Sequence, residues 1–444
     1  MNTPIRDFVK AYAESESVRF HMPGHKGKAY LGFEKYDITE IGGADVLYCA
    51  RGIIKESEAN AARLFGSYRT YYSAEGSSLC IKAMLALVLS GKKEGSYILA
   101  GRNAHKAFIY ACALLDADVK WLYPAENEHI CTCRITADDI NKALAACSIL
   151  PSAVYITSPD YLGNVSDIYS VSKVCDKYNV PLLVDNAHGA YLHFLPEPLH
   201  PMDCGAFMCC DSAHKTLPVL TGGAYLHLSE KAKHLAENAE NMLSVFASTS
   251  PSYLILQSLD VCNVYLENGY REKLAERVLV TDCIKYELRN KGYYTEETEP
   301  LKIVVNCKKS GLNSGDFINY LRSSSIEVEF FDEDYIVLML SCDNSENELK
   351  TLLKAFSVYK LRLGKPAENK AFKLEYGKKS VSIREAVFSE KEVVEIEKSV
   401  GRICGCPTVS CPPAVPVAVS GEIITESVAG YMQQLGITHI EVVK

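Results

Sequence analysis

Long apolar runs are missing from this sequence. The longest one, residues 83–89, is far shorter than the roughly 20 residues that a helix needs to span a bilayer. The first 20 residues mix acidic and basic side chains and contain no apolar stretch of the kind that a secretory signal carries. We therefore expect a cytoplasmic protein that has no membrane as its partner.

Paired cysteines with C-x2-C spacing are also missing, although the chain contains 17 cysteines. That spacing is typical of structural zinc sites, so no metal site is predicted. Cysteines of a cytoplasmic protein stay reduced, which excludes a disulfide framework. Cys209 and Cys210 lie in an apolar run and are expected to belong to the core.

An excess of positive charge is lacking as well, because the formal net charge is −8. This balance argues against nucleic acid as a partner. Apolar residues make up 48% and charged residues 23% of the 444 positions, which is ordinary for a globular protein large enough to hold two or three domains. No internal repeat and no low-complexity tract is present.

Short apolar segments alternate with helical patterns through the first half of the chain. Strands are predicted at residues 96–100, 154–157, 181–184, 206–210 and 224–228. This alternation predicts an α/β fold with a mostly parallel sheet and helices on both faces. Ligands of such sheets bind at the carboxyl ends of the strands, where this sequence places its polar clusters.

A lysine follows the predicted strand 206–210. Lys215 stands between Ser212-Ala213-His214 and an apolar stretch, which suits a desolvated amine that could form an imine with a carbonyl. An ordinary loop lysine is the alternative interpretation. Asp185 comes 30 residues earlier, at the end of the strand 181–184. A carboxylate at one strand end and a lysine at another are the pair that pyridoxal phosphate chemistry requires.

A helix is predicted to begin at Gly76-Ser77-Ser78. The backbone N–H groups and hydroxyls at such a start favour an anion such as a phosphate, although a plain N-cap serine is the alternative. Ser212 and His214 could complete this phosphate site. From about residue 271 short strands and helices predict a smaller α+β region.

Several motifs resemble those of the bacterial ornithine/lysine/arginine decarboxylases of the short form. They are HMPGHKG (21–27), DITEIGGAD (37–45), RNAHKA (102–107), VDNAHGA (184–190), DSAHKTLPVLTGG (211–223), STSPSYLILQSLD (248–260) and CPPAVPVAVSGEIIT (411–425). The resemblance implies pyridoxal phosphate as cofactor and the fold of aspartate aminotransferase, fold type I, plus smaller α+β C-terminal domains. It implies an arm at residues 1–20, a large cofactor-binding domain at 21–275, a small domain at 276–360 and a C-terminal decarboxylase-like domain at 361–444.

The resemblance also implies roles for single residues. Lys215 would hold the cofactor, Asp185 would pair with its pyridine nitrogen, His105 would stack on its ring and His188 would lie beside it. Gly76, Ser77, Ser78, Ser212 and His214 would hold the phosphate. The family's active site lies at a homodimer interface, so the segment 248–250 with Thr249 is expected to reach the phosphate of the partner.

Four positions depart from the family pattern. Glu75 and Asn186 replace a usual asparagine and glutamate, Ala414 replaces a glycine, and Gly222-Gly223 replace bulkier residues. A carboxylate at position 75 would repel a nearby phosphate unless it points away. These departures leave the cofactor chemistry intact and point to an atypical subfamily.

The expected reaction is decarboxylation of an amino acid, most of all lysine, arginine or ornithine, to the amine and carbon dioxide. Glu329, Asp45 and Glu40 are the candidate partners for a distal cation of the substrate, and Arg384 is either a carboxylate clamp or a structural residue. An aminotransferase or carbon–sulfur lyase of the same fold is one alternative. A catalytically weak, cofactor-binding regulator is the other.

Overall fold

The computed structural model describes residues 1–91, 95–124, 129–361, 374–407 and 413–444. The chain forms two compact units. The first unit contains residues 1–99, 136–156 and 167–272, and the second contains residues 100–135, 157–166 and 273–444. Within the described part, no helix is both long enough and apolar enough to cross a membrane. Residues 361–375 are rich in lysine, which predicts a connection, and residues 407–420 contain four prolines, which predicts a rigid irregular segment. Most of the first stretch and part of the second lie outside the described residues.

The helices and strands of the described residues are as follows. The α-helices are α1 (Pro4–Glu14), α2 (Ile53–Leu64), α3 (Gly76–Leu89), α4 (Lys106–Leu115), α5 (Ala137–Ala145), α6 (Ile168–Lys177), α7 (Ala213–Thr216), α8 (Ala236–Phe246), α9 (Tyr253–Glu267), α10 (Tyr270–Asn290), α11 (Cys307–Ser310), α12 (Ser314–Ser323), α13 (Glu346–Val358), α14 (Ile383–Phe388) and α15 (Glu426–Gln434). The strands are β1 (Arg69–Ser73), β2 (Tyr97–Gly101), β3 (Asp118–Leu122), β4 (Ala153–Thr157), β5 (Leu182–Asp185), β6 (Met208–Asp211), β7 (Ala224–Leu228), β8 (Tyr294–Thr295), β9 (Lys302–Asn306), β10 (Phe330–Phe331), β11 (Tyr335–Met339), β12 (Lys391–Glu395) and β13 (His439–Val443).

The larger sheet has seven strands in the order β1-β7-β6-β5-β4-β2-β3. Strands β5 and β6 pair in parallel, with Asp185 opposite Cys210, whereas β7 runs antiparallel to β6 and β1. The sheet is mostly parallel and helices accompany it, which confirms the predicted α/β class. The parallel pairing brings the carboxyl ends of β5 and β6, and hence Asp185 and Asp211, to the same edge.

Strand β6 and helix α3 of the first unit are apolar because other elements enclose them. All four residues of β6 are buried, and Cys209 and Cys210 belong to the core as predicted. Helix α3 carries ten buried residues along its 14 positions. A helix that is apolar on every side must be enclosed by other elements, and α3 packs against β1, β6, β7 and α8. This enclosure fixes the start of α3, where Gly76 and Ser77 lie.

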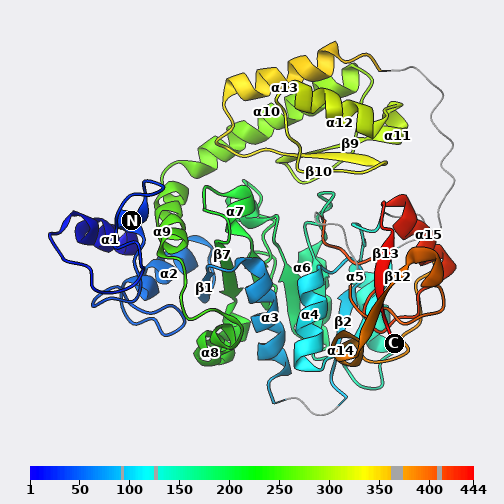
Figure 1. Ribbon diagram of the computed structural model, residues 1–444, viewed down its shortest axis with the longest axis horizontal. Coiled ribbons are helices and arrows are strands. Elements are labelled where there is room, and N and C mark those ends of the chain that lie inside the picture. Colours follow the sequence, from blue (N-terminus) through cyan, green and yellow to red (C-terminus); the bar gives the residue numbers. More distant parts are fainter. Residues whose placement is uncertain (92–94, 125–128, 362–373, 408–412) are drawn as a thin grey trace. The chain divides into compact units, whose positions relative to one another are not determined.

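A smaller antiparallel sheet in the order β10-β11-β9-β8 lies in the second unit. In Figure 1 the helices α10, α12 and α13 lie along one face of this sheet, and their apolar side chains form one core with it. The sequence also predicts a strand at residues 326–330, and this prediction is wrong for most of its length, because only Phe330 of that range is in a strand. Ile326 and Val328 pack on the core without joining the ladder, so their alternating pattern reflects packing alone.

Strands β12 and β13 form a two-stranded antiparallel sheet in the C-terminal part of the second unit. Helix α15 packs with it in a core that also contains Cys404 and Met432. The four-part division of the chain that the resemblance implied stays a prediction.

Candidate active site

Lys215 lies on a single helical turn that follows β6. The backbone N–H of Leu217 donates to the carbonyl of Ala213 and closes this turn, α7. The Lys215 side chain is half-buried, and its Nζ lies 3.0 Å from Nε2 of His188. The structure therefore brings together two of the residues that were predicted to act on the substrate.

Asp185 is buried at the end of β5. Its Oδ2 accepts a hydrogen bond from the Tyr155 hydroxyl at 3.1 Å, and its Oδ1 accepts one from the Ala187 N–H at 3.3 Å. Burial raises the pKa of Asp185, and the positive charge of Lys215 opposes that rise. A buried carboxylate held mainly by neutral donors would gain from a cationic partner such as a protonated pyridine nitrogen.

Tyr155 and Cys210 are site residues that the sequence did not reveal. Tyr155 is one of several buried tyrosines, and nothing in the strand 153–157 distinguishes its hydroxyl from the others. The Sγ of Cys210 lies 3.8 Å from Oδ1 of Asp185 and donates to it. Only the pairing of β5 with β6 makes this neighbour of Asp185 predictable.

The predicted phosphate residues gather at the start of α3. The Ser212 hydroxyl donates to the Ser77 hydroxyl at 2.8 Å, so strand β6 and helix α3 meet through these two predicted residues. His214 accompanies them, and its Nδ1 lies 2.9 Å from the Gly223 carbonyl. Burial lowers the pKa of His214 and favours the neutral imidazole. Two hydroxyls beside the N-terminus of a 14-residue helix form a suitable anion cradle.

Two departures from the family pattern receive a structural reason here. The N–H of Gly76 donates to the Gly222 carbonyl at 2.7 Å. Gly222 has a φ of +101°, and a Cβ at this position would lie 2.9 Å from the Ala74 carbonyl oxygen, so a glycine is required. Glu75 is exposed, and its carboxylate accepts from the Ser248 N–H at 2.6 Å. That bond directs its charge toward the 248–250 segment.

The structure says less about how the other predicted cofactor residues lie relative to Lys215 and Asp185. Ser78 is half-buried on the first turn of α3, and Thr249 is exposed next to the anchored Ser248. His105 belongs to the second unit, where its side chain caps α4 by accepting from the Ala107 N–H at 3.1 Å. Its stacking on a cofactor ring stays a prediction.

One group of buried side chains among the described residues offers three potential metal ligands: His200, Cys209 and Asp211. The Nδ1 of His200 accepts from the Met202 N–H, so its proton is on Nε2 and points at Asp211, 2.9 Å away. Burial also raises the pKa of Cys209 well above its ordinary value, which disfavours the thiolate that a metal needs. His200 and Asp211 already form a hydrogen bond with each other.

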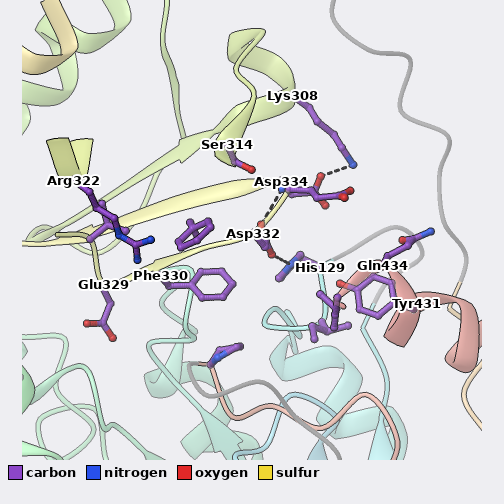
Figure 2. Close-up of a pocket in the computed structure, with 16 residues that line it drawn as sticks. His129, Lys308, Ser314, Arg322, Glu329, Phe330, Asp332, Asp334, Tyr431 and Gln434 are labelled. Atoms are coloured by element: carbon purple, nitrogen blue, oxygen red, sulfur yellow. Dashed lines mark hydrogen bonds and ion pairs between the residues drawn. The ribbon is translucent and has the colours of Figure 1, made fainter. Parts of the chain in front are cut away.

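A cavity of about 470 Å³ opens in the second unit (Figure 2). Its wall includes an ion pair between His129 and Asp332, at 2.7 Å, and a second one between Lys308 and Asp334. Glu329 also lines the cavity and accepts a hydrogen bond of 2.7 Å from the Tyr161 hydroxyl. This cavity therefore contains one of the three carboxylates predicted to bind a substrate cation.

Arg384 has a structural role in the second unit. Its guanidinium donates to the carbonyls of Ala113 and Leu114 at 3.0 and 3.2 Å, at the end of α4. Cations at a helix C-terminus stabilise the helix through its last carbonyls. The structural alternative for Arg384 therefore fits the contacts better than a substrate clamp does.

In the first unit, the Lys215 turn, the buried Asp185 and the anion cradle lie at the carboxyl ends of strands in an α/β sheet. The protein therefore belongs to the class of α/β proteins that have a lysine and a carboxylate in a site at the strand ends. The family model described as "Orn/Lys/Arg decarboxylase, major domain" matches residues 3–303. The chain belongs to this family and is an amino acid decarboxylase.

Known relatives agree with this assignment. The arginine decarboxylase of Halalkalibacterium halodurans is 30% identical over 463 aligned positions, covering 97% of this chain and 93% of the relative. The arginine decarboxylase of Bacillus subtilis is 29% identical and covers the same shares. A lysine decarboxylase structure from Francisella novicida has a TM-score of 0.82 at 16% identity and covers all of this chain and 81% of that one. The fold is fold type I, as predicted.

Proposed function

We propose that this protein is a pyridoxal phosphate-dependent decarboxylase of a basic amino acid, with arginine as the first candidate. The contact of Lys215 with His188, next to the buried Asp185, is the observation that carries the proposal. Arginine is ranked ahead of lysine and ornithine because the relatives described above, which cover nearly the whole chain, are named arginine decarboxylases.

The side chains present fit this cofactor. Lys215 would hold it covalently, Asp185 would pair with its ring nitrogen, and Ser77 with Ser212 would bind its phosphate at the start of α3. When bound, the cofactor accepts the electron pair that the leaving carbon dioxide leaves behind. Burial raises the pKa of Asp185 because it destabilises the negative charge of the carboxylate. A protonated ring nitrogen next to Asp185 would offset this cost.

His188 and Lys215 are the candidate proton donors. The distance of 3.0 Å between His188 Nε2 and Lys215 Nζ allows a proton to pass from one nitrogen to the other. Either group can then return a proton to the α-carbon of the product. His188 is itself buried, which keeps bulk water away from this exchange.

Glu329 is the carboxylate that we propose for the distal cation of the substrate. Asp45 is already used, because its carboxylate accepts from the N–H groups of Val46, Arg51, Gly52 and Ile54 at the start of α2. Glu40 is engaged by the hydroxyl of Thr39. Glu329 differs from both because it lines a cavity, where its carboxylate also accepts from the Tyr161 hydroxyl.

A homodimer with shared active sites is part of the proposal. Large apolar side chains are exposed in the N-terminal part of the first unit, with exposed fractions of 92% for Phe20, 77% for Tyr30 and 77% for Leu31. Such side chains are normally covered by a partner, and a second copy of this chain is the partner that we propose.

Carbon dioxide release from arginine, lysine and ornithine by the cofactor-loaded protein tests this function. Glu329→Gln should raise the KM for the preferred substrate by about ten- to a hundredfold, because a charge-assisted hydrogen bond is replaced by a neutral one. Glu333→Gln is the matched control, since Glu333 lines the same cavity, and its KM should stay within about twofold of wild type. A keto acid product would support the aminotransferase alternative, and no turnover would support the regulator.

Equal KM values for wild type and Glu329→Gln would refute the role of Glu329 and leave the reaction standing. Release of carbon dioxide from a neutral amino acid alone would refute the substrate class.

A further inference from the structure

Asp211 is a fully buried carboxylate at the end of β6 that has no role in the chemistry above. Its Oδ1 accepts from Nδ2 of Asn186 at 2.7 Å. Its Oδ2 accepts from Nε2 of His200 at 2.9 Å and from Nε2 of His227 at 3.1 Å. Three N–H donors satisfy a buried carboxylate in its ionised form.

The protons of this network can be located from the far sides of the two imidazoles. The Nδ1 of His200 accepts from the Met202 N–H at 3.2 Å, which leaves its proton on Nε2. The Nδ1 of His227 lies 2.8 Å from the Thr70 hydroxyl, and burial lowers the pKa of His227. Both rings are therefore neutral donors to Asp211, and the network carries one net negative charge.

The contacts of Asp211 join the two segments that carry the active site. Side chains alternate between the faces of a strand, so Asp185 and Cys210 share one face while Asn186 and Asp211 meet on the other. The N–H of Asn186 also donates to the Cys210 carbonyl at 2.9 Å. One segment continues to His188 and the other to Lys215.

The loop after β5 is closely packed around the Asn186 side chain. The Gly189 N–H donates to the Asn186 carbonyl at 2.8 Å, and a Cβ at position 189 would lie only 2.0 Å from Asn186 Oδ1. The Asn186 amide has little room to move, and Asp211 is the group that orients it. His188 lies within the same turn, between Asn186 and Gly189.

We propose that Asp211 is a positioning residue: its ionised carboxylate, held by His200 and His227, orients Asn186 and so fixes the distance between the Asp185–His188 loop and the Lys215 turn. This inference rests on the proposed function, because the residues that it positions are those of the cofactor site. It also explains why Asn186 can replace the glutamate that is usual at this position. Asp211, at the end of the neighbouring strand β6, supplies a carboxylate and bonds to Asn186.

Spectroscopy of the cofactor-loaded protein tests the inference. Asp211→Asn keeps the shape and removes the charge, while a flip of the Asn186 amide can preserve their hydrogen bond. The pH midpoint of the visible absorbance band should fall by about one unit, because a negative charge that favours the protonated lysine–cofactor linkage is lost. Asp211→Ala should weaken pyridoxal phosphate binding about tenfold or more by leaving buried donors unsatisfied.

Two further variants provide controls. Cys209→Ala alters a side chain that is buried two residues earlier on the same strand, and it should leave both the midpoint and the cofactor affinity unchanged. The exchange Asn186→Asp with Asp211→Asn restores a carboxylate–amide pair and should recover cofactor binding that Asp211→Ala loses. The exchange keeps the test decisive if Asp211→Ala does not fold.

An unchanged midpoint in Asp211→Asn together with wild-type affinity in Asp211→Ala would overturn the inference and leave the proposed function intact. A fall in thermal stability of all Asp211 variants with an unchanged midpoint and affinity would assign Asp211 a purely structural role, which also overturns it. A wild-type protein without any visible band would overturn the proposed function and the inference with it.

Discussion

Single residues of the candidate site in the first unit are held in place by hydrogen bonds from their neighbours. Asp185 is held by Tyr155 and Ala187, and Ser77 is held by Ser212, so these predicted cofactor residues are already oriented by neighbours. Hydrogen bonds that fix a rotamer in advance reduce the entropy lost when a ligand binds. Residues of β4 and of the segments that follow β5 and β6 therefore preorganise the candidate site.

Ala414 is a strained residue, because it has a φ of +58° and carries a Cβ. The left-handed region costs a non-glycine residue about 1–2 kcal/mol, whereas a glycine loses about 0.5–1 kcal/mol more in chain entropy on folding. Ala414→Gly should therefore raise the free energy of unfolding by about 0.5 kcal/mol, measured by urea denaturation. Ala418→Gly, at a buried alanine with ordinary φ, should lower it. A loss of stability in Ala414→Gly would contradict the strain argument.

At the level of elements, helix α1 is capped by a residue far along the chain. Asp260 of α9 is buried, and its carboxylate accepts from the N–H groups of Ile5 and Arg6 at 2.9 and 3.0 Å and from the Ser57 hydroxyl at 2.5 Å. A carboxylate at the N-terminus of a helix satisfies donors that the helix cannot. This residue joins α1, α2 and α9.

Burial raises the pKa of Asp260 to about 6, although the Ser57 and backbone hydrogen bonds act against this shift. A raised pKa in the folded state means that its stabilising contribution is present below the ordinary pKa of about 4 and is lost as pH rises toward 6. The unfolding free energy of wild type minus that of Asp260→Asn should therefore fall by up to about 3 kcal/mol between pH 4 and pH 6.5. Urea denaturation at several pH values measures this difference. A constant or rising difference would contradict the shift.

The elements also show what could be predicted from the sequence. The alternation of apolar strands and helices predicted β4, β5, β6 and β7 within a residue or two, because short buried strands and glycine-rich turns are local properties. Glycine and two serines predicted the start of α3 for the same reason. Long-range pairing was not predictable, so the capping of α1 by Asp260 and the neighbours Tyr155 and Cys210 of Asp185 were missed.

The network around Asp211 shows the same limit within the site. Asn186, His200, Asp211 and His227 are scattered over more than 40 positions, and no spacing rule connects them. They meet because β5, β6 and β7 are adjacent in the sheet, and because the His200 side chain hydrogen-bonds to Asp211 at the end of β6. The lysine, the aspartate and the serines could be predicted because each stands at a strand end or a helix start, where motifs are contiguous.

On the scale of the whole molecule, the residues named in the proposed function are distributed over both units. The first unit contains Lys215, Asp185, His188 and the serines proposed to bind the phosphate. The second unit contains the cavity that Glu329 lines (Figure 2). Glu329 accepts a hydrogen bond from the Tyr161 hydroxyl there. A division of this kind lets one fold keep its cofactor chemistry while the substrate cavity varies.

The absorbance spectrum of the purified protein with pyridoxal phosphate, for wild type and for Lys215→Ala, tests the central claim most directly. We predict a visible band in wild type that is absent from Lys215→Ala, together with carbon dioxide release from arginine by wild type alone, because only the lysine can hold the cofactor as an imine. A wild type without the band in excess cofactor, or a Lys215→Ala variant that retains both the band and the turnover, would contradict the account.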